Sequence, residues 1–108
     1  MLVKDLLNKE NFKPLAVCDP DREINGVYIG DLLSWVMGRA SADQAWITIM
    51  SNVNVLAVAS LTDVACVILA DGSVPEAQVI ERAQAQDVNL FVSQHPSYEV
   101  CAALGKRI

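Results

Sequence analysis

Two short apolar runs constrain the fold of this chain more strongly than any other feature. Residues 46–50 and 65–70 are rich in aliphatic and β-branched side chains and do not alternate with polar ones. This pattern is typical of strands covered on both faces of a parallel sheet. The segment between them is long enough for the crossover that parallel pairing requires. Its valines favour a strand, but Asn52 or Asn54 is suited to cap a helix, and we predict a helix over 52–62.

The rest of the chain continues this alternation of strand and helix. Asp31 stands at the capping position of one further helix, and Gly26 at a turn within an extended piece. The expected inward stripe of that helix consists of Leu32, Leu33, Val36, Met37 and Ala40. The predicted elements are a short amphipathic helix within 1–10, a strand at 15–18, a turn at 19–22, the extended piece at 24–29, the helix over 32–40, a strand at 90–92, and a final helix ending near Gly105, where Lys106 and Arg107 suit the helix dipole.

The sharpest local signal is a capping box. Ser73-Val74-Pro75-Glu76 has the spacing at which the serine accepts from the third helical amide and the glutamate bonds back to the amide of the cap residue. This motif predicts a helix from there to about Gln86. Its predicted inward residues are Ala77, Ile80 and Ala83.

This order of elements predicts an α/β fold, a three-layer sandwich in which helices flank a mostly parallel sheet of about four or five short strands. A single domain over 1–108 is the default for a chain of 108 residues, of which 53% are hydrophobic. Ligands of such sheets bind in the loops at the carboxyl ends of the strands. Those loops are therefore the default location for a binding site.

Charge and cysteine content exclude several classes of function. A net charge of -5 with scattered basic residues argues against nucleic-acid binding, which needs a stripe of Lys and Arg. No apolar run approaches the roughly 20 residues that span a bilayer, and the first residues lack the features of a secretion signal. Three cysteines, an odd number, fit reduced thiols better than disulfides. We expect a cytoplasmic protein that binds neither nucleic acid nor a membrane.

No arrangement of residues indicates catalysis or a metal centre. The only histidine, His95, has no designated partner for acid–base chemistry and precedes a proline, which favours a loop residue. Cys18, Cys66, Cys101 and His95 lack the short paired spacings of structural zinc. Walker-type phosphate loops, Gly-x-Gly-x-x-Gly and Gly-x-Ser-x-Gly are absent. We therefore expect no enzyme, no metal and no cofactor.

Two further features leave alternatives open. The charged segment 19–23 either orders a ligand or partner or is a solvated turn, and the usual exposure of charged residues favours the turn. Trp46 lies within an apolar run and is expected in the core. Trp35 belongs either to the core or to an exposed patch that pairs subunits.

Three segments resemble the DRTGG domain family. They are Tyr28-Ile29-Gly30-Asp31-Leu32-Leu33-Ser34, Trp46-Ile47-Thr48-Ile49 and Leu69-Ala70-Asp71-Gly72-Ser73-Val74-Pro75. The resemblance covers nearly the whole chain and is closest to short stand-alone bacterial members. Domains of this family occur in long phosphotransacetylases and between CBS domains of some pyrophosphatases, and a related domain begins HPr kinase/phosphorylase. The resemblance implies a regulatory or assembly module, often dimeric, and not a catalyst.

The chain differs from other members at the positions that name the family. Where they carry Gly-Asp-Arg, this chain reads Met50-Ser51-Asn52, and a following acidic position is Asn54. Thr-Gly-Gly is replaced by Ala70-Asp71-Gly72. Loss of the arginine removes a natural partner for an anion.

Two functions follow as expectations. The first is a non-catalytic regulatory or assembly module that forms a homodimer or binds a protein partner. The alternative is a sensor of a small ligand, an adenine nucleotide, whose base or sugar is read by neutral side chains at the strand ends. The amides of the loop at 71–73 also suit an anion. The candidate ligand-binding residues are Ser51, Asn52, Asn54, Asp71, Gly72, Ser73, Ser93 and Ser97.

Overall fold

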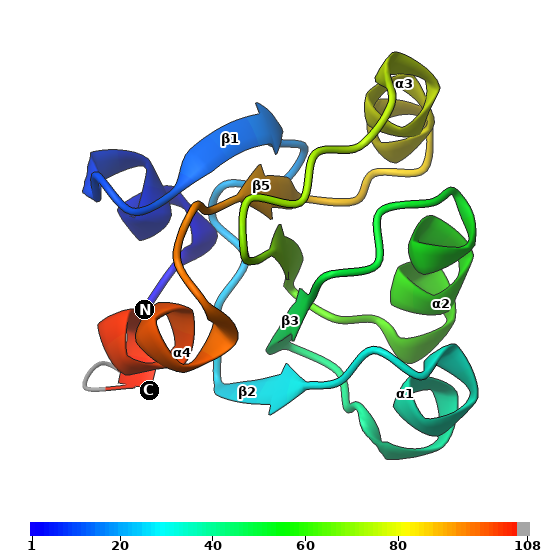
Figure 1. Cartoon of the computed structure of the whole chain (residues 1–108), viewed down its shortest axis with the longest axis horizontal. Helices are drawn as coiled ribbons and strands as arrows, with labels where there is room; N and C mark the ends of the chain where they lie inside the picture. The colour runs from blue at the N-terminus through cyan, green and yellow to red at the C-terminus, as the bar shows by residue number, and fades with distance from the viewer. Residues whose placement is uncertain (106–108) are drawn as a thin grey trace.

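A mixed five-stranded sheet forms the centre of the computed structural model, which describes residues 1–105. Its strands lie in the order β1-β5-β4-β3-β2 (Figure 1). Strands β2 to β5 are parallel, and β1 runs antiparallel to β5. The elements are η1 (Val3–Asn8, a 3₁₀ helix), β1 (Lys13–Ala16), β2 (Gly26–Ile29), α1 (Leu33–Arg39), β3 (Gln44–Thr48), α2 (Asn54–Thr62), β4 (Cys66–Leu69), α3 (Ala77–Ala85), β5 (Leu90–Val92) and α4 (Ser97–Gly105). The predicted α/β fold with a mostly parallel sheet is confirmed.

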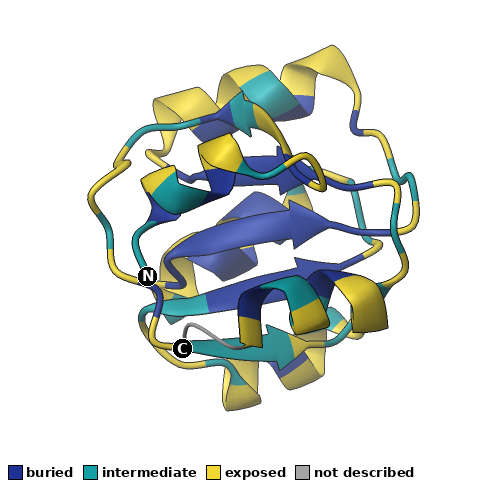
Figure 2. Ribbon diagram, turned by 90° about the vertical axis from the view of Figure 1, so that its left-hand side faces the viewer, coloured by how far each residue is buried: buried dark blue, intermediate teal, exposed yellow. Residues whose placement is uncertain are grey.

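Helices cover both faces of the sheet. α1, α2 and α3 lie on one face, and α4 and η1 on the other (Figure 1). Successive residues of β4 point to opposite layers: Val67 and Leu69 pack toward α1–α3, whereas Cys66 and Ile68 pack toward α4 and η1. In Figure 2 the buried colour fills the central strands and the exposed colour follows the outer sides of the helices. This two-sided burial explains why the central strands do not alternate apolar with polar residues.

The two edges of the sheet are built differently. β1 shifts register between Pro14 and Ala16 where it pairs with β5. Pro14 has no N–H to donate, and an edge strand tolerates this because one of its sides is free of pairing. At the other edge, β2 pairs with β3 alone. Gly26 is paired with Gln44 inside β2, so the turn predicted at Gly26 is wrong.

The start of α1 differs from the prediction. Asp31 does not cap the helix, whose cap position is Leu32 without a side-chain bond. Instead, Asp31 Oδ1 accepts from Thr48 Oγ1 at 2.8 Å and from the backbone N–H of Ile49 at 2.9 Å. The carboxylate is therefore engaged by the end of β3 and is not available to the first turn of α1.

The predicted inward stripe of α1 is only partly correct. Val36 is buried, and Leu33 and Ala40 pack partly against the core. Leu32 is 61% exposed and Met37 is also exposed. A helix of this length at the end of the layer has a neighbour on one side only, so part of its apolar surface faces solvent.

β3 and α2 form the predicted strand and crossover helix. Trp46 is fully buried, as expected, and its indole Nε1 donates to the carbonyl oxygen of Gly30 at 2.9 Å. Asn52 Oδ1 accepts from the backbone N–H of Asn54 at 2.9 Å. Of the two asparagines, Asn52 is therefore the one whose side chain bonds to the first amide of α2. The helix ends at Thr62, and the residue after it, Asp63, adopts the left-handed conformation with φ 59°.

The predicted capping box does not form. Ser73 Oγ donates to the carbonyl oxygen of Ile49 at 2.8 Å, and Glu76 is itself the cap residue, without a side-chain bond to a backbone amide of the helix. Pro75 disfavours the helical conformation of the residue before it, which delays the helix to Ala77. The buried residues of α3 are Val79 and Ala83, whereas Ala77 is exposed.

The C-terminal part follows the prediction. β5 and α4 occupy the expected ranges, and His95 lies in the loop between them. The role expected for Lys106 and Arg107 lies outside the described residues. Among the helices of residues 1–105, none combines the length and apolar character needed to span a membrane.

Candidate functional site

The loops after β3, β4 and β5, at the carboxyl ends of these strands, are connected by hydrogen bonds. The loop after β4 lies in the middle and bonds to both neighbours. Ala70 N–H donates to the carbonyl of Thr48 at 2.9 Å, and Ser73 Oγ donates to Ile49, both at the end of β3. Gly72 N–H donates to the carbonyl of Ser93 at 2.9 Å, after β5. The default ligand face is therefore held in a fixed shape.

The same bonds occupy the amides that were expected to accept an anion. Asp71 N–H donates to His95 O at 2.8 Å, and Ser73 N–H donates to Ala70 O at 3.1 Å, in addition to the Gly72 bond. Asp71 and Gly72 take left-handed φ values of 62° and 72°, which aims these amides inward. The loop therefore has no free amide cluster to offer a phosphate.

A hollow of about 530 Å³ opens beside this loop, between the start of α2 and the start of α3. We call it the β3–α2 hollow. It falls within the size range of small-molecule sites. Ser51 and Asn52 of the candidate residues are brought together here. The lining residues are Ile49, Met50, Ser51, Asn52, Val53, Val74, Glu76, Gln78 and Val79.

The other candidate residues lie elsewhere. Ser93 is buried, accepts from the N–H of His95 at 3.2 Å, and borders a smaller hollow of about 170 Å³. Asn54 and Ser97 begin α2 and α4 and line neither hollow. Asp71, Gly72 and Ser73 shape the edge from the middle loop without lining either hollow. The candidate residues thus form no single pocket.

The imidazole of His95 makes a local contact with a carboxylate. Its Nδ1 lies 2.9 Å from Glu99 Oε2, one turn into α4. No cluster of three or more His, Cys, Asp and Glu side chains able to hold a metal occurs within residues 1–105.

An apolar patch lies at the β2 edge of the sheet. Ile29 is 47% exposed, Leu32 61% and Trp35 55%. The guanidinium of Arg39 lies 4.0 Å from the centre of the Trp35 ring, a cation–π distance. These residues, with Asp31, border a shallow hollow of about 470 Å³. We call Ile29, Leu32 and Trp35 the Trp35 patch.

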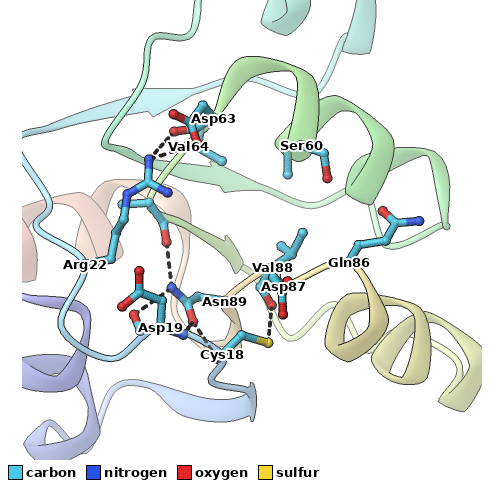
Figure 3. A pocket seen from close by; sticks show the side chains of 12 residues that line it. Cys18, Asp19, Arg22, Ser60, Asp63, Val64, Gln86, Asp87, Val88 and Asn89 are labelled. Carbon is cyan, nitrogen blue, oxygen red and sulfur yellow. Dashed lines mark hydrogen bonds and ion pairs between the residues drawn. The ribbon is translucent and has the colours of Figure 1, made fainter.

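At the opposite, amino-terminal ends of the strands lies a further hollow, of about 580 Å³ (Figure 3). Arg22 spans its rim. Arg22 Nη2 lies 2.8 Å from Asp43 Oδ1 and 3.1 Å from Asp63 Oδ1. Partial burial would lower the pKa of Arg22, but its hydrogen bonds to both aspartates outweigh burial, and the pKa lies above its usual value. The Nε and Nη2 groups of the guanidinium are therefore engaged within the protein.

Asn89 closes the floor of the same hollow (Figure 3). Its Oδ1 accepts from the N–H groups of Cys18 and Asp19 at 2.8 and 2.9 Å. Its Nδ2 donates to the carbonyl oxygens of Asp19 and Ala65 at 3.1 and 2.9 Å. Because all polar atoms of the buried amide are bonded, Asn89 serves to join β5 to the β1–β2 loop.

The thiols of Cys18 and Cys66 are poor nucleophiles. Burial, and then the nearby carboxylate of Asp87, raise the pKa of Cys18 above its usual value. Burial raises the pKa of Cys66 to about 12, with a smaller opposing effect of Arg22. A thiol acts as a nucleophile through its thiolate, which both environments disfavour.

Two residues important at the amino-terminal edge were not identified from the sequence. The sequence around Arg22 favours a solvated turn, and nothing near it in the chain indicates two partners 21 and 41 residues away. Asn89 has a weak signal, since an amide directly before an apolar strand is unusual and points to a bonded polar group.

Comparison with known proteins places the fold but not the family. No protein-family model matches the chain, and no curated protein matches it. The structure is similar to the CBS and DRTGG domains of the regulatory region of Clostridium perfringens pyrophosphatase, solved in complex with its activator diadenosine tetraphosphate. The TM-score is 0.66 at 14% sequence identity. The match covers 84% of this chain and 40% of that chain, so the likeness is one of fold and concerns less than half of the other protein.

Proposed function

We propose that this chain is a non-catalytic regulatory module that acts by assembly and forms a homodimer through the Trp35 patch. The observation that carries the proposal is the exposure of three large apolar side chains side by side at an unpaired sheet edge. Exposed apolar clusters of this kind mark interaction sites. Trp and Arg, which stack here, are enriched at the energetic centres of interfaces.

Charge supports a second copy of the chain as the partner. Asp31 and Arg39 border the same hollow, so the surface carries one charge of each sign. In a dimer with a twofold axis, the same patch of both copies forms the interface. Asp31 of one copy can then lie near Arg39 of the other, and the reverse, so the patch is complementary to itself. A neutral patch also allows two copies to meet despite the net charge of -5 on each.

The non-catalytic part of the proposal is supported by the state of the reactive groups. His95 is paired with a carboxylate at the surface, and the environment of Cys18 disfavours its thiolate. Among the described residues, no cysteine shares a hydrogen bond with a basic side chain, and the hydroxyl that donates to a carboxylate, Thr48 to Asp31, is buried. The free thiols suit the reducing cytoplasm, where we place the module.

Sedimentation velocity over a concentration series tests the assembly. We expect a concentration-dependent dimer, accompanied by a blue shift of tryptophan emission, since Trp46 is already buried and Trp35 becomes so. Leu32→Arg and Trp35→Ser should give monomers. Tyr98→Ser, at an 81% exposed position on α4 across the sheet, is the matched control and should leave the dimer unchanged. A wild-type chain that stays monomeric at high micromolar concentration would contradict the proposal.

A second candidate function is sensing of an adenine nucleotide. It is favoured by the presence of Ser51 and Asn52 in the β3–α2 hollow and by the fold shared with a regulatory region solved with an adenine dinucleotide activator. A thermal-shift panel of nucleotides tests it. A ligand at about 100 times its Kd adds roughly 2.7 kcal/mol, which raises the midpoint of a domain of this size by about 10 °C. A flat panel would remove this candidate.

A further inference from the structure

We propose that the β3–α2 hollow binds the uncharged end of its ligand, a nucleobase with its ribose, and leaves any phosphate in solvent. The preferred class is therefore an amino-bearing heterocycle or nucleoside rather than a nucleotide. The inference rests on the second candidate function above and specifies what that site recognises.

The charges of the hollow exclude a phosphate. Its only ionisable lining residue is Glu76, and neither Lys nor Arg is among the residues that border it. The first turn of α2 does not compensate, because the N–H groups of Asn54, Val55 and Leu56 already donate to oxygens of Asn52 and Val53. A phosphate placed here would meet a carboxylate without a neutralising partner.

The same lining suits an uncharged heterocycle. Met50, Val53 and Val79 supply apolar surface for the face of a ring. The Glu76 carboxylate, which accepts from Gln78 Nε2 at 3.1 Å, retains acceptor capacity for an exocyclic amino group. Ser51 and Asn52 place a hydroxyl and an amide in the same hollow, where they can pair with ribose hydroxyls.

The two walls are held at a fixed separation. The bond from Ser73 Oγ to Ile49 O joins the segment before α3 to the end of β3 beside the hollow. Ile49 is itself anchored by its N–H bond to Asp31. A preformed site loses little conformational freedom on binding, which makes recognition of a small neutral ligand feasible.

Isothermal titration with adenosine, cytidine, AMP and ATP at low salt tests the inference. We expect a nucleoside to bind about tenfold more tightly than its nucleotide, with the ratio falling as salt screens Glu76. Glu76→Gln should remove most of the difference in affinity between the nucleoside and its nucleotide. Glu81→Gln, on the exposed side of α3 outside the hollow, is the matched control and should preserve the ratio.

A variant that adds a positive charge to the rim of the hollow tests the opposite preference, for a nucleotide over a nucleoside. Val74 is 73% exposed on the rim of the hollow, so Val74→Arg should fold normally and reverse the preference in favour of AMP. If wild-type protein binds AMP or ATP more tightly than adenosine, this inference is wrong while the sensor function stands. If neither nucleosides nor nucleotides bind, both are wrong.

Discussion

Asn89 and Ala65 are joined by a buried hydrogen bond, from the side-chain Nδ2 of the first to the carbonyl oxygen of the second at 2.9 Å. The two residues stand directly before the neighbouring strands β5 and β4. The same amide also holds the β1–β2 loop through Cys18 and Asp19. One polar side chain therefore links the β1–β2 loop to the starts of two neighbouring strands at the amino-terminal edge of the sheet.

Replacing Asn89 should destabilise the fold without affecting the opposite edge. Asn89→Ala leaves the carbonyl of Ala65 and the amides of Cys18 and Asp19 without partners, for a loss of about 2–4 kcal/mol in the free energy of unfolding. Urea denaturation measures it. Asn11→Ala, at an exposed turn, should change stability by less than about 0.5 kcal/mol. Equal effects of the two variants would refute this role of Asn89.

Variants of Ser73 distinguish a helix cap from a cross-loop donor. Because Ser73 Oγ donates to Ile49, Ser73→Thr should retain the bond, and Ser73→Ala should cost about 1 kcal/mol. Ser73→Asp, a good cap residue, should cost at least as much as alanine, since a carboxylate cannot donate to a carbonyl. Thermal unfolding of the three variants measures the order. Recovery of stability in Ser73→Asp would restore the capping-box interpretation.

The ion pairs of Arg22 should show energetic coupling that salt weakens. A double-mutant cycle of Arg22→Met and Asp43→Asn should give a coupling of about 1 kcal/mol, since the pair is partly buried and doubly bonded. The coupling should fall as ionic strength rises. Lys4 and Asp21 form an exposed pair at 3.1 Å and provide the control cycle, in which little or no coupling is expected. Denaturant titrations in low and high salt provide the values.

Alkaline pH should destabilise the protein through Cys66. Its pKa is 9.0 when exposed and about 12 in the fold, so the unfolded chain loses a proton first. The contribution is complete below pH 9 and is lost as the pH rises toward 12, about 2 kcal/mol by pH 10.5. Cys66→Ala should be less stable at neutral pH but lack this part of the pH dependence. Cys101→Ala is the comparison and should keep it; identical pH profiles for wild type and Cys66→Ala would count against the prediction.

The order and type of the elements follow from the sequence because β3 and β4 are buried on both faces. Such strands consist of continuous apolar runs, which can be recognised in the sequence. The crossover helix α2 was also predictable, since a parallel pair leaves few other ways to connect its strands. Local rules were less reliable at the loops. Asp31 and Ser73 both have the residue type of a helix cap, yet each bonds to the end of β3 instead.

The position of the candidate sites depended on tertiary structure. Ser51 and Asn52 could be assigned to the carboxyl-terminal edge from the sequence, because any residue that follows a parallel strand lies there. Their meeting with Glu76 and Gln78 in one hollow, and the separation of Ser93 into another, arise from the packing of α2 against α3 and from the bonds of the β4 loop. No short-range pattern encodes such contacts.

Sequence alone therefore determined the layered α/β architecture, because strand and helix periodicity and burial are properties of neighbouring residues. Tertiary structure alone decided that Trp35 is exposed, that Arg22 joins Asp43 and Asp63, and that Asn89 is bonded on all sides. Each of these outcomes depends on partners brought together across the sheet. The free energy of such contacts depends on the distance between the groups and on their burial in the folded chain. Neither quantity can be read from residues that are neighbours in the sequence.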